Sequence, residues 1–156
     1  MAFENTNMFN QRIKIKQLLS GTATGTQVVV MGWVRTFRSN RFIAINDGST
    51  INNLQVVIEG VPKPEVFNNL NTGACIQVIG VLKESLGKGQ NVELTTETNI
   101  VILGEARPEE YPIQPKKHSM EFLREKAHLR PRTSTFSAIF RVRHAASFAI
   151  HKYFND

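Results

Sequence analysis

Arginine and aromatic residues alternate with aliphatic ones in the first third of the chain. Arg35, Arg38 and Arg41 lie close to Phe42, and Gln55 follows one expected strand later. Arginine binds phosphate groups and aromatic rings stack on bases, so this combination is typical of a surface for single-stranded nucleic acid. The first functional hypothesis is therefore RNA or DNA binding.

Alternation along the expected strands predicts which way three side chains point. Ile43 and Ile45 would share one face of their strand, which leaves Phe42 on the opposite, polar face. Gln55 and Glu93 each lie between two aliphatic residues, so the same rule turns both polar side chains away from the core. An aromatic ring, an amide and a carboxylate would then be available for stacking and for hydrogen bonds to base edges.

Each of these residues also has an ordinary explanation from sequence alone. Aromatic rings are more often buried than displayed, so Phe42 is also a candidate core residue. The alternatives for Gln55 and Glu93 are a solvated strand amide and a solvated acid on an edge strand. Arginines beside a hairpin, such as Arg35 and Arg41, are usually solvated in any protein. Lys83, Lys88 and Gln90, at the glycine-spaced loop of residues 86–90, are a weaker signal for ligand contact.

Composition and charge indicate one ordinary domain with an appendage and favour a polyanionic partner. The chain has 156 residues, is 41% hydrophobic and carries a formal net charge of +6. Most of the positive surplus lies after Ala106. A single cysteine, Cys75, cannot form an internal disulfide, and neither a secretion signal nor an apolar run of membrane-spanning length is present. We therefore expect a cytoplasmic protein without a membrane partner.

The pattern of apolar residues and turn signals predicts a mainly β fold. A short helix or extended lead-in precedes the first strand, and Gly32 marks a bulge or tight bend in it. The residues from Asn46 to Ser49 have the side-chain chemistry of a turn. Three strands, a helix and two further strands give the order of a five-stranded OB-fold barrel. The expected strands are 27–37, 41–46, 54–58, 74–82 and 92–103, with the helix at 64–70.

After Gly104 the composition changes to a proline-rich segment and then to helix. Thr133 or Ser134 would cap a helix from Phe136 to Phe154, whose apolar residues recur at helical spacings. No stop signal closes this helix, so we expect the chain to be the front of a longer protein. The expected divisions are an N-terminal extension (1–26), the barrel (27–106), a linker (107–133) and the first helix of a further domain (134–156).

Neither a metal site nor a phosphate loop is predicted. The four histidines are not spaced as metal ligands, and Cys75 is the only thiol. Gly87-Lys88-Gly89 is too short for a nucleotide-binding loop. The Phe140-Arg141-Val142-Arg143 run is interpreted as helix surface.

Several segments, taken in order, resemble the N-terminal anticodon-binding barrel of the class II aminoacyl-tRNA synthetases for Asp, Asn and Lys. They are Gly32-Trp33-Val34, the run from Phe42 to Ser49, Leu54-Gln55-Val56-Val57 and Val92-Glu93-Leu94. The later run from Tyr111 to Ser119 and the His128-Leu129-Arg130-Pro131-Arg132-Thr133 segment resemble the asparaginyl-tRNA synthetase family in particular. The resemblance covers nearly the whole chain from about Ile13 onward.

The resemblance implies a role for each candidate site residue. Phe42 matches the family phenylalanine that stacks on the central anticodon uridine, and Gln55 matches a glutamine that hydrogen-bonds a base edge. Glu93 matches a glutamate at the anticodon site, and Arg38 is the first choice for phosphate contact by alignment. Arg35 and Arg41 are further candidates for phosphate.

The resemblance also implies what the whole protein would do. A full-length enzyme would join asparagine to its tRNA with ATP and Mg²⁺ and would be a homodimer. This chain alone would bind neither cofactor and would contain no catalytic residue. Two alternatives stay open at this point. One is a stand-alone single-stranded nucleic-acid-binding barrel, and the other is a relative that charges aspartate.

Overall fold

The computed structural model describes residues 8–61, 63–85, 87 and 89–156. The chain divides into two compact units, the first ending at Gln114 and the second beginning at Pro115. The first unit holds all the described strands, two short α-helices and a 3-10 turn at Met8–Gln11. The second unit is helical.

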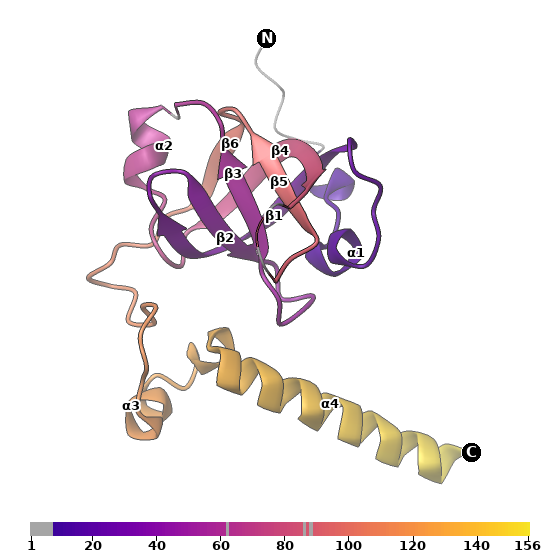
Figure 1. Ribbon diagram of the computed structural model, residues 1–156. Coiled ribbons are helices and arrows are strands. Elements are labelled where there is room, and N and C mark those ends of the chain that lie inside the picture. The colour runs from indigo at the N-terminus through magenta and orange to yellow at the C-terminus, as the bar shows by residue number, and fades with distance from the viewer. Residues whose placement is uncertain (1–7, 62, 86, 88) are drawn as a thin grey trace. The chain divides into compact units, whose positions relative to one another are not determined.

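The described strands of the first unit form a closed barrel with one added strand (Figure 1). The sheet order is β1-β2-β3-β5-β4-β6, and antiparallel pairing of β1 with β4 closes the first five strands into a ring. Neighbouring strands are antiparallel except β3 and β5, which run parallel. The predicted OB-fold architecture is confirmed. The strands are β1 (Gln27–Arg38), β2 (Phe42–Asn46), β3 (Leu54–Ile58), β4 (Cys75–Glu84), β5 (Val92–Thr96) and β6 (Ile100–Gly104).

The length of β1 allows it to close the barrel. Its first half pairs with β4 and its second half pairs with β2, and the register shifts between Val34 and Thr36. The sequence predicted a bulge or bend at Gly32. The structure places the bulge a few residues later, and Gly32 instead allows a close approach, because a Cβ there would lie 2.9 Å from the Asn46 carbonyl oxygen.

The segment 92–103, expected to be one strand, forms two. β5 and β6 pair with successive stretches of the same edge of β4, and residues 97–99 interrupt them. A close contact lies at this break, because a Cβ on Gly60 would meet the Glu97 carbonyl oxygen at 2.8 Å. The chain bends here to follow the curved edge of β4, which a single straight strand cannot do.

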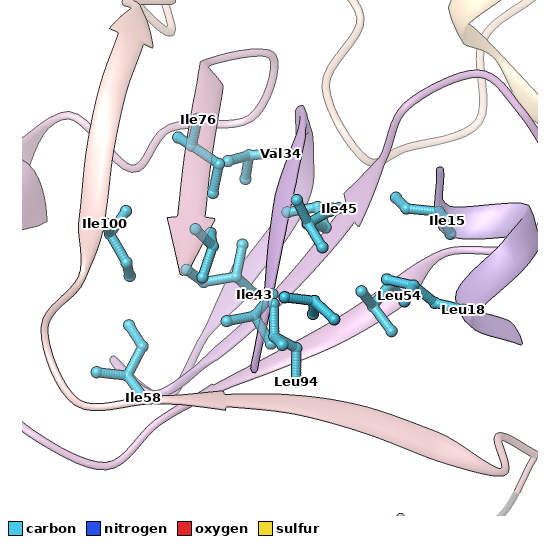
Figure 2. Packing of buried hydrophobic residues seen from close by; sticks show 14 of the residues in the cluster. Ile15, Leu18, Val34, Ile43, Ile45, Leu54, Ile58, Ile76, Leu94 and Ile100 are labelled. Atoms are coloured by element: carbon cyan, nitrogen blue, oxygen red, sulfur yellow. The ribbon is translucent and has the colours of Figure 1, made fainter. Parts of the chain in front are cut away.

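A short helix, α1 (Ile15–Leu19), covers one end of the barrel, and α2 (Pro64–Asn68) lies at the opposite side (Figure 1). The sequence left the choice between helix and extended lead-in open for α1. Ile15 and Leu18 have no exposed surface, and Figure 2 shows both beside Leu54 in the core. The Ile15 N–H donates to the Asp47 Oδ2 atom at 3.0 Å, which ties α1 to the turn after β2.

The turn after β2 is held by its own side chains, as predicted. The Gly48 N–H donates to Asn46 Oδ1 at 2.8 Å, and the Ser49 N–H donates to Asp47 Oδ1 at 2.9 Å. Asn46 also donates from its amide nitrogen to the Asn52 carbonyl oxygen at 2.9 Å. These bonds fix the loop between β2 and β3, and with it the register of the two strands.

Part of the proline-rich segment packs on the barrel. Gly73 has φ +95°, and a Cβ on it would lie 2.7 Å from the Tyr111 ring. Ile113 is buried, and the Gln114 Nε2 atom donates to the Tyr111 carbonyl oxygen at 2.8 Å. Residues up to 114 therefore belong to the barrel unit, while the rest of this segment belongs to the second unit.

The second unit contains α3 (Met120–Glu125), a 3-10 turn at Arg130–Arg132 and the long helix α4 (Ser134–Asn155). The Thr133 hydroxyl accepts a hydrogen bond from the Phe136 N–H at 3.3 Å, so the predicted cap is confirmed. The Arg130 guanidinium lies 4.8 Å from the Phe136 ring centroid. Several large apolar side chains of α4 are exposed, namely Ile139, Val142, Phe148, Ile150, Tyr153 and Phe154.

Among the helices that the structure describes, none has both the length and the apolar content of a membrane span.

The close packing at Gly80 generates a test of the barrel. A Cβ on Gly80 would lie 2.4 Å from the Thr95 carbonyl oxygen, so Gly80→Ala forces β4 and β5 apart. We expect a loss of about 1 to 3 kcal/mol in the free energy of unfolding, measured by urea denaturation. Gly104→Ala is the matched control, since its Cβ meets nothing nearer than 3.7 Å, and we expect a change within about 0.5 kcal/mol. Equal losses in both variants would contradict this account of the barrel.

Candidate nucleic-acid interface

The outer face of β2 displays the aromatic ring on which the nucleic-acid hypothesis depends. Ile43 and Ile45 are 0% exposed and lie in the core, where Figure 2 labels both. Phe42 and Ala44 are partly exposed, as alternation along the strand requires. Phe42 is therefore an outer-face residue of the barrel and not part of its aliphatic core.

Gln55 lies on the same face as Phe42. In the antiparallel pair of β2 and β3, Phe42 is opposite Val57 and Ala44 is opposite Gln55. Residues directly opposite each other in such a pair point to the same side of the sheet. Gln55 is half-buried between the core residues Leu54 and Val56. The amide and the ring thus occupy neighbouring rows of one surface.

The same surface continues onto β5. Val56 is in register with Leu94, and both are core residues, so Glu93 projects outward as Gln55 does. Val57 and Thr95, which are next in register on this face, are each 6% exposed. Between Phe42 and β4, the outer face therefore contains two residues, Val57 and Thr95, that are largely shielded from water.

A polar network at the hairpin between β4 and β5 holds Glu93. The Ser85 hydroxyl donates to Glu93 Oε2 at 2.9 Å, and the Gln90 Nε2 atom donates to Ser85 Oγ at 2.9 Å. Gln90 Nε2 also lies 3.5 Å from Glu93 Oε2. The sequence indicated Gln90, with Lys83 and Lys88, as a weak signal for ligand contact and did not identify Ser85. Lys88 lies outside the described residues. The one sequence signal for Ser85 was its position next to a glycine-spaced loop.

The three candidate arginines surround the β1–β2 hairpin. Arg38 is opposite Phe42 in register and exposed, and the Arg41 guanidinium lies 5.8 Å from the Phe42 ring centroid. Ser39 and Asn40 have φ of 52° and 53°, and the Arg41 N–H donates to the Arg38 carbonyl oxygen at 3.1 Å. This is the geometry of a tight type I′ hairpin turn, which holds both arginines beside the ring.

Arg35 has a different environment from the other two arginines. It lies at the β1 bulge between Val34 and Thr36 and is half-buried. Its carbonyl oxygen accepts from the Thr72 hydroxyl at 3.5 Å. The structure therefore brings Arg38 and Arg41 to the aromatic ring and assigns Arg35 to the bulge.

Trp33 is a second aromatic residue on this side of β1, and sequence reasoning did not select it. It is opposite Asn46 in the β1–β2 register and is 38% exposed. Its position follows from the strand pairing, which the sequence did not specify in advance.

No group of three or more histidine, cysteine, aspartate or glutamate side chains among the described residues is arranged to hold a metal ion.

The comparisons with known proteins agree with this geometry. Residues 28–102 match the family described as the OB-fold nucleic acid binding domain. The chain is 55% identical over 151 residues to the asparagine–tRNA ligase of Parabacteroides distasonis. The aligned region covers 94% of this chain and 32% of that ligase. The chain is also 47% identical over 151 residues to the asparagine–tRNA ligase of Geobacter sulfurreducens, again covering 94% and 32%. The chain thus spans about a third of the length of these relatives.

Solved structures show the same fold. The asparaginyl-tRNA synthetase of Entamoeba histolytica in complex with asparaginyl-adenylate superimposes with a TM-score of 0.72 at 23% identity, over 88% of this chain and 34% of that one. The asparaginyl-tRNA synthetase of Pyrococcus horikoshii gives a TM-score of 0.71 at 21% identity, over 92% and 35%. At these identities the likeness concerns the fold alone.

The closed barrel and the family match define this part of the chain as an OB-fold nucleic-acid-binding domain of the tRNA anticodon-binding type. Its homologues are asparagine–tRNA ligases, and the family resemblance drawn from the sequence is confirmed. These relatives favour the ligase interpretation over a stand-alone barrel.

Adjacent residues of β2 test the assignment of the two faces. Ile43 is fully buried, so Ile43→Ala should lower the free energy of unfolding by about 2 to 5 kcal/mol, as core truncations do. Phe42→Ala removes a larger side chain from a partly exposed site and should cost less than Ile43→Ala. Urea denaturation of the two variants measures the difference. A greater loss for Phe42→Ala would show that the ring belongs to the core.

Proposed function

We propose that the outer face of β2, β3 and β5 binds the anticodon of an asparagine tRNA. The observation that carries the proposal is the register that sets the partly exposed Phe42 ring and the Gln55 amide on neighbouring rows of one surface. A partly exposed aromatic ring can stack on an unpaired base, and an amide offers both a donor and an acceptor to a base edge. Such a surface reads single-stranded RNA.

Each candidate residue has a role in this proposal. Phe42 stacks on the central anticodon uridine, Gln55 hydrogen-bonds a base edge, and Glu93 accepts hydrogen bonds from base N–H groups. Arg38 contacts phosphate beside the ring. Arg41 adds positive charge at the same hairpin, which is supported by its 5.8 Å separation from the Phe42 centroid. Arg35, at the β1 bulge, is a further candidate for contact with phosphate.

The whole protein, by the same proposal, is a cytoplasmic, homodimeric asparagine–tRNA ligase. It joins asparagine to its tRNA with ATP and Mg²⁺, and the similarity to curated ligases supports this. In this proposal residues 27–106 are the anticodon domain after an N-terminal extension (1–26), and residues 134–156 open the catalytic domain. Residues 107–133 are the linker between them, and its first part, up to Gln114, packs with the barrel unit. In this proposal ATP and Mg²⁺ bind to the catalytic domain of the whole protein. Amino-acid activation by the full-length protein, asparagine against aspartate, tests the substrate.

The stacking role of Phe42 gives the direct test of anticodon binding. Phe42→Ala should weaken binding to a stem-loop with the asparagine anticodon by about 1 to 3 kcal/mol, the effect of losing one stacked base. The dissociation constant is measured by fluorescence anisotropy. Phe148→Ala removes an exposed aromatic ring from α4 and serves as the matched control, with unchanged affinity expected.

A second RNA makes the test specific. Replacing the central uridine of the loop should weaken binding to the unaltered chain and have a smaller effect on the Phe42→Ala variant. If a folded Phe42→Ala variant binds the asparagine stem-loop as tightly as the unaltered chain, the stacking mechanism is wrong.

A further inference from the structure

The Ser85 hydroxyl lies at the centre of the hydrogen bonds that hold Glu93. It donates to Glu93 Oε2 at 2.9 Å and accepts from Gln90 Nε2 at 2.9 Å and from the Gly87 N–H at 3.1 Å. Ser85, Gln90 and Glu93 are all half-buried. One hydroxyl therefore connects the backbone of the hairpin loop, an amide side chain and the carboxylate on the outer face.

The obvious ionic partner of Glu93 is engaged elsewhere. Lys83 is directly opposite Glu93 in the β4–β5 register, but its ammonium group lies 3.3 Å from Glu59 Oε1. None of the ion pairs in the described part of the chain involves Glu93. The carboxylate is oriented by neutral donors, so its charge is not cancelled by these contacts. A carboxylate in this state is a strong acceptor for N–H groups.

Fixing a glutamate side chain matters because the side chain is long. An unrestrained glutamate loses rotamer freedom when it binds a ligand, and this loss weakens the interaction. A carboxylate already held at Oε2 loses less rotamer freedom on binding, and its other oxygen has a defined position from which it can accept a hydrogen bond. The same contacts also restrict which base edge can reach it.

We propose that Ser85, supported by Gln90, is a positioning residue that orients the Glu93 carboxylate to accept a hydrogen bond from a base N–H in the anticodon. The proposal rests on the proposed function of the outer face and adds residues that set its specificity. Ser85 acts through Glu93 and does not itself need to contact RNA. The Gly87 N–H donates to the same hydroxyl, which further restricts the orientation of the Ser85 side chain.

A double-mutant cycle separates positioning from a general structural role. Dissociation constants are measured for the asparagine stem-loop and for three loops, each with one anticodon base replaced. Glu93→Gln should reduce discrimination at one anticodon position. Ser85→Ala should reduce discrimination at the same position by roughly threefold to tenfold, the range for one lost hydrogen bond, and at no other position. In the Glu93→Gln background, Ser85→Ala should change discrimination by less than about twofold.

Two further variants keep the test decisive. Ser85→Thr retains the hydroxyl and should preserve discrimination. Gln90→Ala leaves the Ser85–Glu93 bond in place and should give a smaller loss at the same position, which provides the readout if Ser85→Ala does not fold. Thermal unfolding followed by circular dichroism checks the fold of each variant.

The outcomes distinguish this proposal from the one on which it rests. If Ser85→Ala weakens all four loops equally, or keeps its effect in the Glu93→Gln background, the residue is structural and the positioning role is overturned. It is also overturned if Glu93→Gln leaves discrimination intact while Phe42→Ala still weakens binding. If the unaltered chain does not prefer the asparagine loop at all, the proposed function itself fails.

Discussion

Closure of the barrel by pairing of β1 with β4 is the constraint on which the rest of the structure depends. Once the ring is closed, every strand must place one set of side chains inside and the other outside. The curvature requires close backbone approaches, and Gly32 and Gly80 lie where a Cβ would meet a carbonyl oxygen of a neighbouring strand. The aliphatic interior shown in Figure 2 and the polar outer face are two results of the same closure.

This constraint turns separate sequence positions into one surface. Phe42, Gln55 and Glu93 come from three strands, and only the register of β2 with β3 and of β3 with β5 brings them to the same side. The turns between the strands help to fix this register. Asn46 and Asp47 fix the β2–β3 loop and α1, and the left-handed Ser39 and Asn40 set the arginines beside the ring. The binding chemistry that we propose is thus a property of the pairing and not of any single residue.

Much of the fold could be predicted because its signals are local. Strand alternation placed Ile43 and Ile45 inside, the Asn46 to Ser49 turn closes on its own side chains, and Thr133 caps the long helix. The parts that could not be predicted depend on contacts between distant residues. The break between β5 and β6 follows the curved edge of β4, and the helical form of α1 is supported by a bond from Ile15 to Asp47, which lies 32 residues away. The roles of the candidate site residues stay predictions, and the Ser85 network was missed because its bonds form only once the hairpin is folded.

Mapping the RNA contact surface tests the central claim most directly. Backbone amide shifts of the chain are followed by NMR during titration with the asparagine anticodon stem-loop. The account predicts the largest changes at Phe42, Ala44 and Gln55, with little change at Val101 and Leu103 on β6. If the changes gather on β6 while Phe42 and Gln55 stay unaffected, RNA binds elsewhere and the proposed reading face is wrong.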